Sequence, residues 1–158
     1  MDKFTKADQV GQEKLVNQLN KIFSNCTLTI DQHYIDKETV DVYTTATTVS
    51  NVSYLYVFEA KDRTYKHNAK FITDEGVILE IPKYKELMAR KDEYKPMYVH
   101  TFSDDWISIW DVSKLDMSKI KCVLKYLPKT TVEDRGKEWR YVYLIPRSEC
   151  VYDNSFIV

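Results

Sequence analysis

Apolar and polar residues at the start of the chain follow the period of a helix. Within residues 6–24 the apolar side chains fall on one side of a helical wheel: Leu15, Val16, Leu19, Ile22 and Phe23. We therefore expect an amphipathic helix that packs this side against the rest of the protein.

Three segments with the composition of β-strands follow this helix. Residues 26–31 and 39–47 are rich in threonine, valine and tyrosine, and a polar turn lies between them. Residues 52–61, VSYLYVFEAK, give the clearest strand pattern in the chain. Both of its faces are largely apolar, which predicts a central strand buried on both sides.

The second half of the chain predicts one more helix and two β-hairpins. Residues 76–91 keep a helical phase, although Pro82 must either lie in the first turn or kink the helix. Residues 97–102 and 106–112 flank a Ser-Asp-Asp turn. Two further strands, at 120–127 and 139–145, are joined by a polar loop. The sequence thus predicts one domain over residues 1–158, of the α/β (α+β) class, in which helices flank a mixed sheet with extra C-terminal hairpins.

Composition narrows the class of protein without identifying it. With 158 residues, 44% hydrophobic and 30% charged, the chain has the composition of a globular domain. The N-terminal residues lack the apolar stretch of a signal peptide, and no apolar run is long enough for a membrane span. We therefore expect a cytoplasmic protein without a membrane partner. Three cysteines and three tryptophans are expected in the interior: Cys26, Cys122, Cys150, Trp106, Trp110 and Trp139.

Charged residues on two of the predicted strands are the candidate chemistry. Glu59 and Lys61 are two positions apart, so they lie on the same side of their strand, near its C-terminal end. Asp41 lies on the preceding strand and approaches Glu59 if the two strands pair. Two close carboxylates repel each other unless one is protonated or a divalent cation lies between them. Carboxylate oxygens and the carbonyl of Ala60 would suit Mg²⁺ or Mn²⁺.

The arrangement of these residues resembles a known superfamily. Asp41 followed by Glu59-Ala60-Lys61 resembles the core of the PD-(D/E)XK nucleases, with Val40 where the family often has proline. The family order is a helix, a three-strand meander that carries the motif, a second helix and a further strand. This chain follows that order over residues 6–112. The segments EGVILEIPKYKELM and SDDWISIWDV are also similar, in their general residue pattern, to segments of small nuclease-like proteins of bacteriophages and gut bacteria.

The resemblance implies a restriction-endonuclease-like fold and a metal-dependent nuclease. Asp41, Glu59 and the Ala60 carbonyl would hold Mg²⁺ or Mn²⁺, and Lys61 would position a water molecule or stabilise the transition state. Many members add a glutamate from the first helix, for which Glu13 is the candidate. Gln12 is closer to the centre of the apolar face, so a solvated carboxylate at Glu13 is an equally good interpretation.

Basic residues after the motif could contact a DNA backbone. Arg63, Lys66, Lys70 and Lys83 are the candidates, although cations on a helix or loop are usually only solvated. A net charge of −1 excludes a basic field over the whole molecule, so any nucleic-acid interface must be local. A homodimer is plausible because cutting both strands of a duplex requires two sites.

Two other classes of function remain open. The first is a nuclease-fold module that has lost catalysis and binds DNA or a protein. The second is a structural or assembly protein in which the strand charges form a buried ion network. The sequence leaves DNA or RNA, and endonuclease or exonuclease, undecided.

Overall fold

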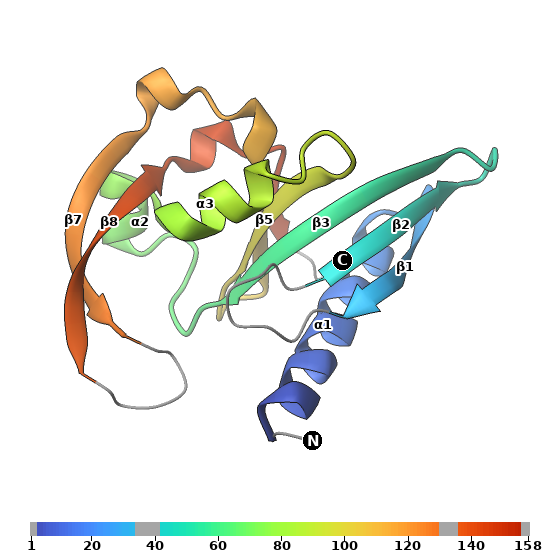
Figure 1. Cartoon of the computed structure of the whole chain (residues 1–158), viewed down its shortest axis with the longest axis horizontal. Coiled ribbons are helices and arrows are strands. Elements are labelled where there is room, and N and C mark those ends of the chain that lie inside the picture. Colours follow the sequence, from blue (N-terminus) through green and yellow to red (C-terminus); the bar gives the residue numbers. More distant parts are fainter. Residues whose placement is uncertain (1–2, 34–41, 130–135, 156–158) are drawn as a thin grey trace.

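A computed structural model describes residues 3–33, 42–129 and 136–155, and they form an α+β architecture of two sheets and three helices (Figure 1). Short 3-10 turns follow β6, precede β7 and follow β8. The helices and strands, in chain order, are α1 (Lys3–Ile22), β1 (Cys26–His33), β2 (Val42–Thr48), β3 (Ser53–Asp62), α2 (Lys70–Glu75), β4 (Val77–Glu80), α3 (Ile81–Met88), β5 (Lys95–Thr101), β6 (Trp106–Asp111), β7 (Lys121–Pro128), β8 (Lys137–Ile145) and β9 (Tyr152–Ser155).

The larger sheet is mixed, with strand order β1-β2-β3-β5-β6-β9. All neighbouring strands are antiparallel except β3 and β5, which run parallel. Parallel neighbours need a crossover connection, and here it contains α2, β4 and α3. The crossover strand β4 pairs with β8 in a second sheet of order β4-β8-β7.

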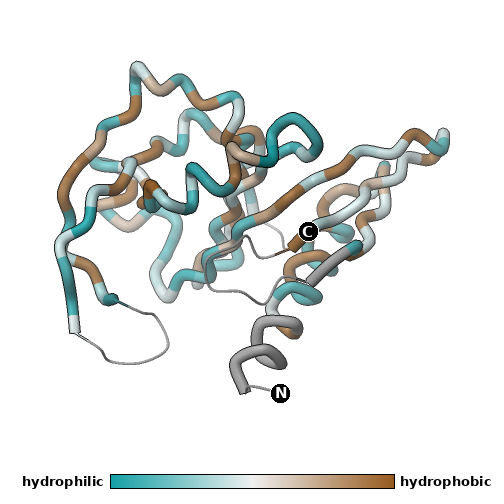
Figure 2. Tube along the Cα trace, viewed as in Figure 1, coloured by the Kyte–Doolittle hydropathy of each residue, from teal (hydrophilic) through white to brown (hydrophobic). Residues whose placement is uncertain are grey.

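Two apolar cores cover opposite faces of the larger sheet. Leu15 and Leu19 of α1 pack with Phe58 of β3 on one face. Val57, the neighbour of Phe58 in the same strand, packs on the other face with Leu87 of α3 and Leu79 of β4. This alternation within β3 is what the period of a strand requires. The middle of β3 is accordingly hydrophobic, whereas the loop between α3 and β5 is hydrophilic (Figure 2).

The prediction of one helix over residues 76–91 is wrong for the first part of this segment. Val77–Glu80 form strand β4, and the helix α3 begins only at Ile81, with Pro82 in its first turn. A short apolar run fits a buried strand as well as a helix, so periodicity alone could not distinguish them. Gly76, with φ of 95° and ψ of −171°, marks the break between α2 and β4.

Two expectations of burial are also wrong. The Trp139 side chain is 65% exposed on β8, and Cys122 is exposed on β7. Trp110, by contrast, is fully buried, and its indole Nε1 donates to the Pro146 carbonyl at 3.1 Å. Trp106, Cys26 and Cys150 are partly buried. No helix in the described part of the chain is both long and apolar enough to cross a membrane.

A candidate metal centre at the end of β3

The Glu59 carboxylate is buried at the C-terminal end of the central strand. Its side chain is 1% exposed, and Lys61 Nζ lies 3.0 Å from its Oε1. Phe58 faces α1, so Glu59 and Lys61 project to the opposite face of the sheet, toward α3. The structure therefore confirms that Glu59 and Lys61 share one side of β3.

A second ammonium group reaches Glu59 from α3. Lys83 Nζ lies 3.6 Å from Glu59 Oε2 and 3.7 Å from Glu86 Oε2. Burial raises the pKa of Glu86, and the negative charge of Glu59 raises it further, against the lowering effects of Lys83 and Arg90. Two lysines and two carboxylates thus form one charged cluster between β3 and α3.

Strand β5 supplies the buried polar neighbours of this cluster. The parallel register places Tyr98 opposite Glu59 and His100 opposite Lys61. Tyr98 donates its hydroxyl to the Ile78 carbonyl of β4 at 2.7 Å. His100 is fully buried. Its Nδ1 accepts a hydrogen bond from Arg63 Nε at 3.5 Å, and its Nε2 has no hydrogen-bond partner among the described residues. Burial lowers the pKa of His100 well below its usual value, and Arg63 and Lys61 lower it further.

The buried neutral His100 predicts a loss of stability in mild acid. In the unfolded chain its imidazole binds a proton below about pH 6.5, but in the folded protein it does not. Acid therefore favours the unfolded state, and stability falls as the pH drops below that value. We therefore expect the free energy of unfolding to decrease between pH 7 and pH 5 because of this group. Urea unfolding at several pH values measures how the free energy of unfolding depends on pH. His100→Gln should make this dependence weaker below neutral pH. An unchanged pH dependence in the variant would rule out His100 as its source.

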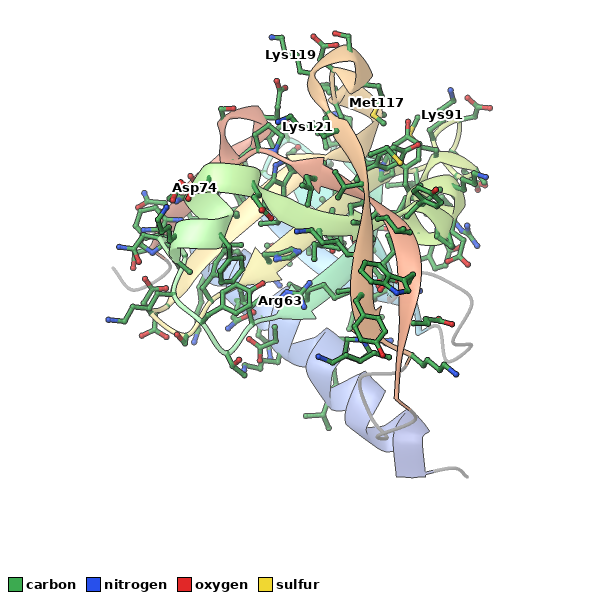
Figure 3. All side chains as sticks on the ribbon, turned by 90° about the vertical axis from the view of Figure 1, so that its left-hand side faces the viewer. Arg63, Asp74, Lys91, Met117, Lys119 and Lys121 are labelled. Atoms are coloured by element: carbon green, nitrogen blue, oxygen red, sulfur yellow. The ribbon has the colours of Figure 1, made fainter. Side chains whose placement is uncertain are left out.

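The loop after β3 is held against the turn between β5 and β6. The Arg63 backbone amide donates to the Thr101 carbonyl at 2.8 Å, so the β3–β5 pairing continues past the strand end. Further along, the His67 imidazole bonds to the Asp104 carboxylate and stacks on Trp106, with ring centroids 3.9 Å apart. These contacts fix Arg63 beside the end of β3, where Figure 3 labels it.

The predicted metal ligands are only partly brought together. Asp41 lies outside the described residues. Ala60 follows Glu59 in β3, and its side chain packs on the α1 side of the sheet. Glu13 is exposed on α1, whereas the adjacent Gln12 is 5% exposed. Since α1 covers the face opposite to Glu59, the structure does not bring Glu13 to that carboxylate.

The four predicted phosphate contacts fall into two groups. Lys83 lies at the charged cluster and Arg63 lies next to His100, on the Glu59 side of the sheet. Lys66 is exposed in the loop, and Lys70 begins α2, where it pairs with Asp74. A small hollow of about 90 Å³ also lies at the end of β3, and its lining residues include Lys61 and Lys14 of α1.

The oxygen atoms at the end of β3 are of the chemical type that binds a hard divalent cation. Carboxylate and carbonyl oxygens are the ligands that Mg²⁺ and Mn²⁺ prefer, and Glu59 and Ala60 offer one of each. Among the described residues no three His, Cys, Asp or Glu side chains gather at one point. The sequence pattern predicts the carboxylate of Asp41 as a further ligand, and this residue lies outside the described part of the chain.

Sequence reasoning missed Glu86 and His100 and gave Lys83 only a phosphate-binding role. One signal for the pair on α3 was present, because Lys83 and Glu86 stand three residues apart on a helix. The position of His100 beside Lys61 depends on the register between β3 and β5, and no pattern in the sequence predicts this register.

Comparison with known protein families, with curated proteins and with solved structures gave no match.

Proposed function

We propose that the protein is a metal-dependent nuclease with a restriction-endonuclease-like fold, which hydrolyses phosphodiester bonds of DNA. One observation carries the proposal: Glu59 and Lys61 lie side by side at the end of the central strand, with 3.0 Å between Nζ and Oε1. A buried carboxylate beside an ammonium group supports the assignment of Glu59-Ala60-Lys61 as an E-x-K motif.

The topology of the larger sheet supports the same proposal. Helix α1 precedes the meander β1-β2-β3, a crossover of α2, β4 and α3 follows, and β5 then pairs parallel to β3. Apart from strand β4 within the crossover, this order agrees with the helix, meander, helix and strand that the resemblance implies. The candidate residues lie at the carboxyl end of β3, where the chain leaves the sheet.

The residues at this site have distinct chemical roles in the proposed reaction. The chemistry that a bound Mg²⁺ or Mn²⁺ supplies is activation of a water molecule and neutralisation of phosphate charge. Glu59, the Ala60 carbonyl and Asp41 would hold the ion. Lys61, whose side chain is 30% exposed, can donate to a phosphate oxygen while it remains next to Glu59.

A non-catalytic nuclease-fold module is the second candidate function. The observation that favours it is the contact of Lys83 with Glu59, because two ammonium groups already balance the buried carboxylate charge. In such a module the cluster would stabilise the fold, and the basic residues near β3 would bind DNA or a protein.

Cleavage assays distinguish the two candidates. Supercoiled, linear, single-stranded and branched DNA and a matching RNA would be incubated with the protein and Mg²⁺, Mn²⁺ or EDTA. We expect cleavage of at least one DNA substrate with metal and none with EDTA. Intact substrates under all these conditions would favour the non-catalytic module.

Metal binding gives an independent measure of the same site. Calorimetric titration with Mn²⁺ should show binding that Asp41→Ala abolishes. Asp92→Ala, which removes an exposed carboxylate between α3 and β5, is the matched control and should leave binding unchanged. Absence of binding by the unmodified protein would contradict the proposed metal centre. Sedimentation with a DNA duplex would test whether two copies assemble to cut both strands.

A further inference from the structure

The β7–β8 hairpin exposes apolar and aromatic side chains on one of its faces. Leu124 stands opposite Tyr141, and Tyr126 stands opposite Trp139. Directly opposed residues of an antiparallel pair share a face. These side chains are exposed by 46%, 63%, 53% and 65%, respectively. They are four of the ten large apolar side chains that are exposed in the described part of the chain, so the hairpin is the main concentration of exposed apolar surface.

The two faces of the hairpin are used differently. On one face Lys125 pairs with Glu75 of α2 at 2.8 Å, and Arg140 pairs with Glu80 of β4 at 3.1 Å. The aromatic face is anchored at its base, where Tyr143 packs edge-on against Tyr84 of α3, with centroids 5.1 Å apart. The outer part of that face is open to solvent, and the hairpin projects away from the larger sheet (Figure 1).

Two of the exposed rings, those of Tyr126 and Trp139, form an aromatic platform by stacking on each other. Tyr126 and Trp139 are stacked, with centroids 5.2 Å apart and an angle of 28° between their planes. Lys137 Nζ lies 5.9 Å from the centre of the Tyr126 ring. Flat rings beside a cation suit the stacking of nucleobases next to their phosphates.

The charge of the aromatic face favours one kind of binding partner over others. Lys137 lies on the aromatic face, opposite Pro128, whereas Lys125 and Arg140 lie on the other face and pair with Glu75 and Glu80. Two copies of the hairpin packed through their aromatic faces would bring two Lys137 ammonium groups into the same apolar contact. A polyanion with flat apolar groups matches both the charge and the rings, and a single-stranded nucleic acid has both properties. In a duplex the faces of the bases are covered by stacking, so they are not available to the platform.

We propose that the aromatic face of the β7–β8 hairpin binds unpaired bases of a single-stranded nucleic acid. This rests on the proposed function, which makes nucleic acid the substrate, and it deepens that function by naming an unpaired or flared segment as the part that is held. Trp139 and Tyr126 stack on bases, and Lys137 contacts the adjoining phosphate.

The test is binding measured in EDTA, so that cleavage is not required. Fluorescence anisotropy would follow a labelled oligothymidine of roughly 20 nucleotides, and the same measurement with a duplex would give the preference. We expect tighter binding of the single strand, and a loss of about tenfold or more in Trp139→Ala. Tyr54→Ala is the matched control, because Tyr54 is an exposed aromatic residue at 45% on the β2–β3 hairpin.

The outcomes separate this proposal from the proposed nuclease. Metal-dependent cleavage without any effect of Trp139→Ala on binding would overturn the hairpin proposal and leave the nuclease standing. Single-strand binding that needs Trp139 but is never followed by cleavage would support the hairpin and contradict the nuclease. A dimer that dissociates in Trp139→Ala, with no change in oligothymidine binding, would show that a second copy is the occupant and would overturn the proposal.

Because Trp139 is exposed, loss of its side chain should leave the fold intact, which circular dichroism would verify. Trp139→Phe retains a ring and is expected to keep most of the affinity. Equal weakening by the phenylalanine and alanine variants would show that ring stacking is not the source of binding.

Discussion

Lys61→Ala is expected to lower the rate of metal-dependent DNA cleavage by about 10²–10³-fold. Lys61 Nζ lies 3.0 Å from Glu59, where the proposed nuclease reaction would take place. In that reaction Lys61→Ala would remove the donor that faces the charge developing in the transition state. Single-turnover rates at saturating protein concentration would measure this loss separately from DNA binding.

Matched lysine variants give this experiment its controls. Lys119→Ala removes an exposed lysine that pairs with Asp116 in the 3-10 turn before β7, away from Arg63 at the end of β3, as the labels in Figure 3 show. We expect it to cleave at the normal rate. Because the Glu59 carboxylate is 1% exposed and keeps Lys83 as a second cation, Lys61→Ala should lower the free energy of unfolding by roughly 1–3 kcal/mol, which chemical denaturation would measure beside the cleavage rate. A folded Lys61→Ala protein with undiminished cleavage would exclude the assigned role.

Gly76→Ala is expected to destabilise the fold by about 3 kcal/mol. Gly76 has a φ of 95°, a region that residues with a Cβ rarely adopt. A Cβ at this position would lie 2.5 Å from the Ile145 carbonyl oxygen, a backbone atom of β8 that cannot move without disturbing the second sheet. Chemical denaturation of the variant and of the unmodified protein gives the difference in unfolding free energy.

The other two glycines provide the comparison. Gly136 also has a positive φ, of 82°, but a Cβ there would meet nothing within 4 Å, so Gly136→Ala should cost only about 1 kcal/mol. Gly11 lies within α1 with open space around it, so Gly11→Ala should stabilise the helix by up to about 1 kcal/mol. If alanine lowered the free energy of unfolding equally at positions 76 and 136, the close approach of position 76 to Ile145 would not be the cause of the destabilisation.

Elements with a long and regular pattern could be predicted from the sequence. The apolar period of α1 predicted a helix and the side that it buries, and the two largely apolar faces of residues 52–61 predicted a strand that is covered on both sides. Strand β4 could not be distinguished from helix, because four apolar-rich residues contain too few repeats to show a period. Strand β9 was missed because its sequence, YDNS, has little strand character, and it is a strand because it pairs with β6.

The candidate site was predictable only within one strand. A spacing of two residues is enough to place Glu59 and Lys61 together, and no tertiary knowledge is needed. Lys83 and His100 reach the same place through the packing of α3 and the register of β5, which depend on the whole crossover. Their contribution therefore had to come from the structure.

The exposure of Trp139 shows a further limit of reading a sequence. Large aromatic residues are usually buried, and the alternation along β8 does not reveal which of its faces is covered. Val142 on the same strand is fully buried on the face that also carries Arg140, whereas Trp139 and Tyr141 are exposed on the other face. Burial in this part of the strand is decided by which face the other elements cover.

The parallel pairing of β3 with β5 constrains the order in which the protein can fold during synthesis. Tyr56 pairs with Lys95, so the nascent chain must extend by about 40 further residues before this contact can close. Until then the meander β1-β2-β3 presents the edge of β3 to solvent, and an uncovered strand edge is a template for pairing with other chains. Glu59 and Lys61 lie on that edge strand and carry charge, which disfavours such pairing before β5 arrives.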